Sequence, residues 1–479
     1  MHLSLRRNKK SESKEPMLIR IDKNILTSLI KLSVPIALTN SIQVAYQLIN
    51  IFWIGRLGAN AVAAISVSFP VVLLMMSLAS GLSIAGSVLI AQHMGAGDFK
   101  AINRIAGQAL LVVVGVSFVI SIAGWFATPF ILTLMGVTGE IYKDACFYMQ
   151  LTFIGMVFSF AFMTYQSTMR GLGEVKNPFY IVLLAVTLNL ILDPLLIFGY
   201  ANIPSGGIGG AARATLITQI LSASIAMFLL FRNRHSLHLQ LGDFVPSFKT
   251  IKLILVIGMP ASIQQSIQAI SVSFTTILVA AFGTVVIAAY GIGFRVLTFV
   301  IIPALSISMA LSTLAGQSIG AGDKHAAREM AITASWASFF LLGGVGVIFF
   351  IFATPIINFF VPDDQLLITE SATVLRYMSV GFGAVGVQLA LMGFYRGAGD
   401  TAIAMFLSAG GLCFVQIPLS VYLSKYSGLR ENGLWLSFPL STSINLAISI
   451  FYFKSDRWKR ISLVTAPHTG ESSASVKTS

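Results

Sequence analysis

The heptapeptide QHMGAGD at residues 92–98 returns, changed at only two positions, as QSIGAGD at residues 317–323. The two copies are separated by an offset of 225, and the same offset aligns Pro35 with Pro260. A constant offset over a long stretch of chain is the sequence mark of an internal repeat. The chain is therefore expected to contain two copies of one structural unit.

A second motif repeats at nearly the same spacing, as RGLGE at residues 170–174 and RGAGD at residues 396–400. Glycine is typical of tight turns, and Asp or Glu is typical of the start of a helix. A phosphate-binding loop is the alternative, but neither motif has a Walker lysine or the fingerprint that follows a strand. We therefore expect both motifs to form turns between helices on the cytoplasmic side.

The composition indicates a membrane protein. Of 479 residues, 56% are hydrophobic and only 10% are charged, whereas soluble domains are about 25% charged. Many uncharged runs reach the roughly 20 residues that a helix needs to cross a bilayer. They are too long and too continuously apolar for the strands of a membrane β-barrel, which are segments of about ten alternating residues. The expected fold class is all-α and integral to the membrane.

The apolar runs divide into twelve predicted transmembrane helices when they are cut at Gly, Pro and charged clusters. They cover residues 26–55, 61–93, 104–134, 141–169, 178–199, 209–231, 251–282, 286–318, 328–356, 368–395, 402–424 and 433–454. Each copy of the repeat holds six of them, an even number, so the two copies run through the membrane in the same direction. This predicts two parallel-repeat six-helix bundles with a substrate cavity between them.

The predicted domains follow from this division. They are a basic cytoplasmic tail at 1–25, an N-terminal six-helix lobe at 26–231, a cytoplasmic linker at 232–250, a C-terminal six-helix lobe at 251–456 and a polar cytoplasmic tail at 457–479. The first 25 residues lack the apolar core of a signal peptide. We therefore expect the N-terminus to stay in the cytoplasm, and an even number of spans places the C-terminus there too.

The basic residues agree with that topology. Of the 31 Lys and Arg residues, 24 fall on the side of the termini and 7 on the other, as the positive-inside rule requires. The net charge of +13 is explained by topology, so no nucleic-acid partner is expected. The two cysteines, Cys146 and Cys413, both fall in predicted spans, and they are too few for a disulfide framework or a metal site. We expect no bound metal cofactor.

One acidic residue stands out within the spans. Asp193 lies inside the fifth predicted helix, far from other charges in the sequence. Ionisable groups in a membrane are costly and usually functional, and burial disfavours the ionised form of a carboxyl group. Asp193 is therefore expected to exchange a proton near neutral pH. The alternative is a structural acid that is satisfied by a polar neighbour.

The neighbours of Asp193 favour a cation site. Asn189 lies one helical turn earlier on the same face, so the pair could hold a proton or Na⁺ through oxygen atoms. Pro194 follows directly and cannot donate to the carbonyl of Leu190, so a bend is expected there.

Polar side chains also form a stripe at helical spacing on the first helix of each copy. In the first copy they are Gln43, Tyr46, Gln47 and Asn50, and in the second they are Gln264, Gln268, Ser271 and Thr275. Such stripes must face protein or water and not lipid. Hydrogen bonding between helices is the structural alternative to a lining role.

With these motifs laid out, the sequence resembles the multidrug and toxic compound extrusion (MATE) family, especially its prokaryotic DinF-like branch. The likeness runs from about Lys31 to Arg460. It is carried by the Pro35 helix with FWIGRLG at 52–58, by residues 92–97, 170–178 and 189–194, and by GGAA at 209–212.

The resemblance implies a V-shaped exporter with two six-helix lobes that exchanges H⁺ or Na⁺ for amphipathic, often cationic, drugs by alternating access. It implies a multi-pass protein of the inner (plasma) membrane that acts as a transporter and not as an enzyme. No cofactor beyond the coupling ion is expected, and the partners are small molecules and the bilayer, with the protein as a monomer.

Site residues carried over from the resemblance lie in the N-terminal lobe. The coupling site would comprise Asp193 and Asn189 with Thr215 of the next helix and Asn50, and Na⁺ would sit at Asp193 and Asn189. The cavity would be lined by Tyr46, Tyr148 and Gln166, to which the stripe adds Gln43 and Gln47. Helix bending is assigned to Pro35 and Pro194.

One departure from the family pattern concerns Asn50, where many relatives have an aspartate. Asparagine keeps a carbonyl oxygen but cannot titrate, so Asp193 would work without a second acid. A lipid-linked oligosaccharide flippase is the alternative within transporters, and such proteins tend to have more spans and a strongly basic cavity. An intramembrane enzyme is the alternative from another class, but it would need paired acids or a nucleophile with its base.

Overall fold

The computed structural model describes residues 22–137, 139–200, 204–232, 237, 239–361, 364–461 and 463. Most of both predicted tails, 1–25 and 457–479, therefore lies outside the described residues. Within the described ranges every regular element is a helix, which confirms the all-α fold class.

The first half of the chain contributes six long helices. They are α1 (Lys23–Gly55), α2 (Ala59–Ala96), α3 (Phe99–Leu134), α4 (Glu140–Gly171), α5 (Lys176–Phe198) and α6 (Gly207–Phe231), followed by the short 3-10 helix η1 (Leu241–Phe244). Within the predicted linker at 232–250, η1 and the first residues of the next helix, from residue 248 on, are helical.

The second half repeats the pattern with more interruptions. It contains α7 (Phe248–Ala280), α8 (Thr284–Gly320), α9 (Lys324–Ile351), α10 (Ala353–Phe360), α11 (Gln365–Val380), α12 (Phe382–Gly397), α13 (Thr401–Gly410), the π-helix η2 (Gly411–Gln416), α14 (Ile417–Lys425), α15 (Glu431–Lys454) and η3 (Arg457–Arg460). Counting over the described residues gives 11 helical spans long and apolar enough to cross a membrane, or twelve with the bent pair α11–α12.

Two predicted spans are broken where residues from elsewhere in the chain approach them. The span predicted at 368–395 bends by 50° between α11 and α12, at Gly381, where a Cβ atom would lie 3.3 Å from the Cα of Pro439. The span at 402–424 contains η2, because the side chain of Asn445 occupies the space beside Gly411, 2.2 Å from where a Cβ would stand. A side chain inserted against a helix is a common cause of a π-bulge.

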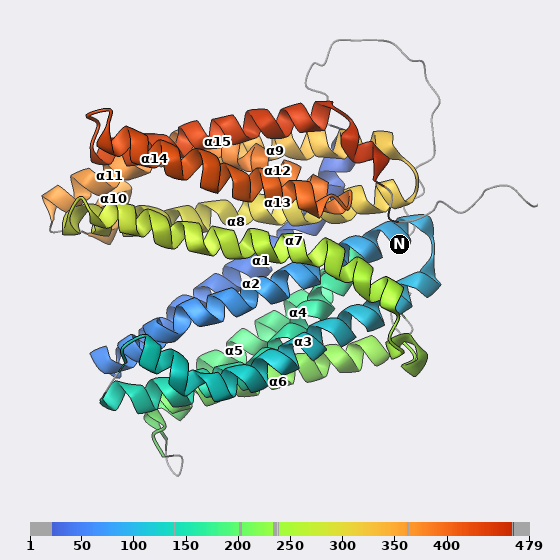
Figure 1. Ribbon diagram of the computed structural model, residues 1–479, viewed down its shortest axis with the longest axis horizontal. Coiled ribbons are helices and arrows are strands. Elements are labelled where there is room, and N and C mark those ends of the chain that lie inside the picture. The colour runs from blue at the N-terminus through green and yellow to red at the C-terminus, as the bar shows by residue number, and fades with distance from the viewer. Residues whose placement is uncertain are drawn as a thin grey trace, which may run out of the picture.

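The helices form two lobes, α1–α6 and α7–α15, that separate at one end and approach each other at the other (Figure 1). We call the second end the convergent end; the C-terminal ends of α2, α4, α8 and α12 lie there. Each lobe surrounds its own apolar core near the separated end. This two-lobe arrangement of helices is the predicted architecture.

The first helix of each half crosses to the other lobe at the convergent end. Leu29 and Leu32 at the start of α1 pack in one core with Leu311 of α8. Reciprocally, Ile254 at the start of α7 packs in one core with Ile102 of α3. The first turns of α1 therefore pack in the core of the second lobe, and the first turns of α7 pack in the core of the first lobe. The boundaries of the lobes in the sequence and in the packing differ at these two helix starts.

The glycine motifs form turns, as their composition predicts. Gly97 and Gly322 close the two GAGD motifs with φ of 73° and 82°, a conformation that glycine adopts without steric cost. The following acids cap the next helices, since Asp98 accepts a hydrogen bond from the backbone N–H of Ala101 at 3.1 Å. The turn interpretation of this motif is confirmed.

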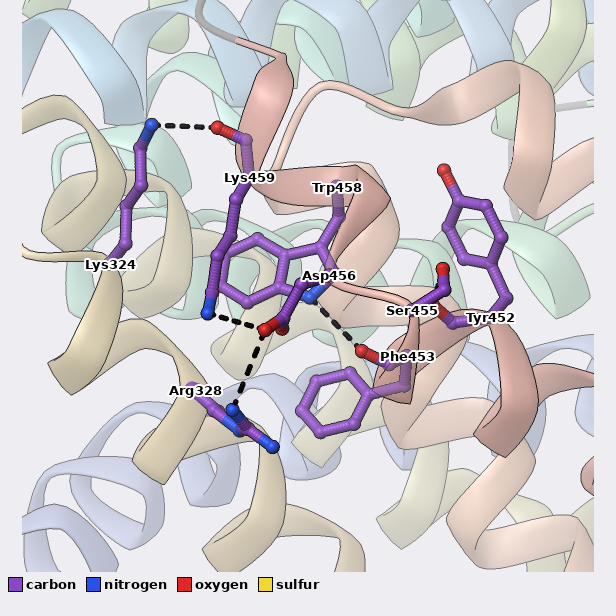
Figure 2. Close-up of polar contacts among 8 residues, drawn as sticks. All are labelled: Lys324, Arg328, Tyr452, Phe453, Ser455, Asp456, Trp458 and Lys459. Atoms are coloured by element: carbon purple, nitrogen blue, oxygen red, sulfur yellow. Dashed lines mark hydrogen bonds and ion pairs between the residues drawn. The ribbon is translucent and has the colours of Figure 1, made fainter.

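The chain after α15 is packed against the second lobe (Figure 2). Asp456 accepts a hydrogen bond from Nζ of Lys459 at 2.7 Å and lies 3.8 Å from Nη1 of Arg328 on α9. Trp458 is 1% exposed, and its ring meets that of Phe394 edge-on with centroids 4.8 Å apart. A buried indole therefore fixes the first residues of the tail predicted at 457–479 to the second lobe.

Candidate functional site

The carboxyl group of Asp193 lies at the centre of the first lobe, on α5, with 0% of the residue exposed. With its amide nitrogen turned toward the acid, Asn189 donates to both carboxylate oxygens at 2.8 and 2.7 Å, and its amide oxygen accepts from Thr218 Oγ1 of α6 at 3.0 Å. Spacing of four residues along one helix brings the amide onto the acid.

A second set of polar groups joins α1 to α6 beside this acid. Tyr46 Oη and Thr215 Oγ1 are 3.2 Å apart, and Asn50 Nδ2 donates to Tyr46 Oη at 3.1 Å. Tyr148 of α4 is near enough to Tyr46 and Asp193 to interact with both electrostatically. The structure thus brings together, around one carboxyl group, the four predicted coupling residues and two of the predicted cavity residues.

This carboxyl group has neutral neighbours only. In the described part of the chain no basic side chain forms an ion pair with Asp193. A buried charge without a counter-charge is strongly unfavourable, so the site can lower its free energy by taking up a cation. Hydroxyl and carboxylate oxygens suit a hard cation such as Na⁺, and the carboxylate alone suffices for a proton. The amide oxygen of Asn189, predicted as a ligand, points to Thr218 and not to the acid. No group of three or more His, Cys, Asp or Glu gathers in the described chain to bind a transition metal.

Helix α5 continues through Pro194 to Phe198, and α1 continues through Pro35. Thr39 Oγ1 donates to the carbonyl of Pro35 at 2.8 Å. Bending at these two prolines during transport stays a prediction.

A cavity of about 560 Å³ lies between the lobes, and most of its wall belongs to the second lobe. One stripe along α8 contributes to the wall over much of its length, from Tyr290 to Ser312. At a rise of about 1.5 Å per residue this stripe is about 33 Å long, similar to the hydrocarbon thickness of a bilayer. The cavity therefore extends deeply into the membrane-spanning part.

The polar stripe of α7 faces this cavity. Gln264, Gln268, Ser271 and Thr275 all line it, which confirms that the stripe faces protein or water. Of the predicted cavity residues of the first lobe, Gln43 and Gln166 line it. Tyr46 and Tyr148 do not; they lie with Asp193 inside the lobe, and Gln47 is exposed. The acid site and the cavity are thus neighbouring but separate regions.

At the convergent end the two lobes are joined by a pair of reciprocal hydrogen bonds. Gln92 of α2 donates from Nε2 to the carbonyl of Gly397 at 2.9 Å. Gln317, its equivalent on α8, donates to the carbonyl of Gly171 at 3.1 Å. We call these two contacts the interlobe latch. Each joins one lobe to the other, and together they hold this end of the molecule closed.

Close backbone approach accompanies the latch. A Cβ atom at Gly95 would lie 1.8 Å from the carbonyl oxygen of Gln317, and one at Gly320 would lie 1.8 Å from that of Gln92. Only glycine fits where helices cross at this distance. The repeated motif QxxGAGD therefore supplies a helix crossing as well as a turn, a role that its turn chemistry alone did not predict.

Two residues of the cavity wall, Arg170 and Arg396, were not predicted from the sequence. They were counted among the basic residues on the cytoplasmic side, but both side chains are only partly exposed and line the cavity near its convergent end. The signal that could have identified them is their equivalent position in the two copies of the RGxGE/D motif.

A helical bundle of paired lobes around a central cavity defines a class of multi-pass membrane carriers. The MatE family model matches residues 35–195 and 260–422, one segment in each half. Since these segments cover more than half of the chain, the protein belongs to the MATE family.

The chain is similar to two bacterial proteins over nearly its whole length. It is 29% identical to the probable multidrug resistance protein YoeA of Bacillus subtilis over 435 residues, 89% of this chain and 93% of that protein. It is 25% identical to an FAD transporter of Shewanella oneidensis over 442 residues, 91% of this chain and 96% of that one. Its fold matches a MATE crystal structure in complex with MaL6 with a TM-score of 0.85, 23% identity and coverage of 91% and 97%.

Proposed function

We propose that this protein is a cation-coupled antiporter that exports amphipathic small molecules, with H⁺ or Na⁺ entering at Asp193. The observation that carries the proposal is the fully buried carboxyl group of Asp193, whose described partners are all neutral. Membership of a transporter family and the name of the multidrug relative support export of small molecules.

The coupling follows from where the acid lies. Binding of a cation changes the charge beside Tyr46 on α1, and the first part of α1 packs in the core of the other lobe. Asn40 of α1 also donates to Ser306 of α8 at 3.4 Å. A cation that binds one arrangement of α1 more tightly than another shifts the equilibrium between the two lobe arrangements.

The energy available is sufficient for useful transport. One charge moving down a potential of 100 mV contributes about 2.3 kcal/mol, enough for about a fifty-fold gradient of substrate at full coupling. We place the protein in the plasma membrane as a monomer, with both termini in the cytoplasm. The convergent end then faces the cytoplasm and the separated end faces outward.

The test is efflux from proteoliposomes under proton and sodium gradients imposed separately, with fluorescent dyes as substrates. Asp193→Asn keeps the size and polarity of the side chain but removes its charge, so we expect loss of cation-driven efflux from a protein that remains folded. Asp144→Asn, on the exposed surface of α4, is the matched control, and this variant should export the dyes at the parent rate. Full activity of Asp193→Asn under both gradients would refute coupling at this acid.

A further inference from the structure

Two arginines from equivalent places in the repeat face the same cavity. Arg170 lies in the last turn of α4 in the first half and Arg396 in the last turn of α12 in the second, and both line the cavity between the lobes. Each stands directly before the glycine whose carbonyl accepts a hydrogen bond in the interlobe latch. We call this pair the cationic pole of the cavity.

Neither guanidinium is neutralised by the protein. Nη1 of Arg170 contacts the sulfur of Met309 at 3.5 Å, and a thioether is only a weak acceptor. Nε of Arg396 is buried and has no hydrogen-bond partner. Within the described residues neither arginine forms an ion pair with a carboxylate.

The acid of the second motif is committed elsewhere. Asp400 accepts a hydrogen bond from Tyr452 Oη at 2.5 Å and from the backbone N–H of Ile403 at 3.3 Å. It therefore caps the next helix and binds a tyrosine while Arg396, four residues earlier, turns into the cavity. In the motif at 396–400, the acid Asp400 therefore has a structural role, and the base Arg396 has no acidic partner.

Two positive charges at one end of a cavity are an unusual feature of a membrane protein. Both guanidinium groups stand in the wall of the same cavity, and removing each from water is costly unless a counter-charge is supplied. A guanidinium presents a planar fork of donors that matches carboxylate, sulfonate and phosphate groups. An anion bound between them would relieve both costs at once.

The rest of the wall suits an amphipathic molecule. Toward the separated end Tyr290 and Trp435 stack with ring centroids 6.0 Å apart and an angle of 11° between their planes. Between this stack and the cationic pole the wall carries uncharged amides and hydroxyls, among them Gln264 and Ser308. No acidic side chain is present among the described residues of the lining.

We propose that the cavity binds amphipathic anions, with the carboxylate, sulfonate or phosphate held by Arg170 and Arg396 and the apolar body toward the aromatic stack. Export of the bound anion rests on the proposed function, but binding does not. This inference replaces the cationic substrates that the family resemblance implied.

The experiment compares two dyes that share a xanthene ring system and differ in charge, fluorescein as the anion and rhodamine 6G as the cation. Fluorescence anisotropy with the full-length protein in nanodiscs of neutral phosphatidylcholine measures both affinities. In Arg170→Gln and in Arg396→Gln we expect fluorescein to bind about tenfold more weakly, the effect of losing one charge-assisted contact. Rhodamine 6G should bind the variants at least as well as it binds the parent.

Further variants separate a binding role from a structural one. Arg170→Lys and Arg396→Lys keep the charge and should retain much of the fluorescein affinity. Arg376→Gln is the matched control, because this exposed arginine contacts Thr354 outside the cavity. Unchanged fluorescein binding in both glutamine variants, or an equal loss of both dyes, would overturn the proposal.

The source of a natural anion is resolved by competition. Displacement of fluorescein when phosphatidylglycerol is added to the nanodisc assigns the cationic pole to a lipid headgroup, and displacement by soluble naphthalene sulfonate alone assigns it to a dissolved amphipathic anion. Displacement by neither compound would count against anion binding. Because binding is measured without a gradient, failure of cation-driven efflux leaves this result standing, and the two proposals fail separately.

Discussion

Truncation of the interlobe latch should open the convergent end. Gln92→Ala and Gln317→Ala each remove one hydrogen bond between the lobes, of 2.9 Å and 3.1 Å respectively. A hydrogen bond of this kind contributes about 0.5–1.5 kcal/mol net. The double variant therefore loses about 1–3 kcal/mol of lobe–lobe attraction, which shifts the equilibrium between closed and open arrangements by a factor of about 5–150.

The assay is a distance distribution between two spin labels at the convergent end. Lys100→Cys at the start of α3 and His325→Cys at the start of α9 offer exposed positions, one in each half. The two native cysteines, Cys146 and Cys413, are first replaced by alanine. We expect the double latch variant to gain a population with longer separation than the parent protein shows.

The matched control is Gln150→Ala, which removes a glutamine contact within the first lobe, to the carbonyl of Trp125 at 3.5 Å. It should leave the distance distribution as it is. Gly95→Ala provides an independent perturbation, because its methyl group would stand 1.8 Å from the carbonyl oxygen of Gln317 and force the helices apart. If the distribution stays the same in the double variant and in Gly95→Ala, the latch does not hold this end closed.

Two further outcomes follow from contacts described above. Asn189→Ala removes both hydrogen bonds to the carboxylate of Asp193. Because a hydrogen bond to a charged group contributes about 1.5–3 kcal/mol, cation-driven efflux in proteoliposomes should slow at least about tenfold. Efflux at the parent rate would contradict the role assigned to Asn189. Trp458→Ala removes an indole that is 1% exposed and packs between Phe394 and Phe453. Because such truncations cost about 3–5 kcal/mol, the midpoint temperature of thermal unfolding in detergent should fall by several degrees. An unchanged midpoint would show that the turn after α15 is not part of the core.

The sequence predicted the architecture well because its signals are periodic and local. Apolar length gives the spans, the offset of 225 gives the two halves, and the stripe at Gln264 and Gln268 correctly faces the cavity. The proximity of Asn189 to Asp193 also follows from helical spacing alone. These features depend on residues within one helix or on matching copies of it.

Other features depend on contacts between segments far apart in the chain. The bend at Gly381 reflects the approach of Pro439, and the π-helix at Gly411 reflects the side chain of Asn445. Neither contact can be found from local composition. For the same reason the place of Arg396 in the cavity wall could not be predicted, because residues of both halves form that wall.

The reciprocity of the helix crossing bears on the origin of the protein. Gln92 donates to the second half as Gln317 donates to the first, and each half also supplies the acceptor and the close glycine. A contact in which the same patch serves both partners is the isologous interface of a two-fold homodimer. A single-copy ancestor could thus have paired with itself through this surface.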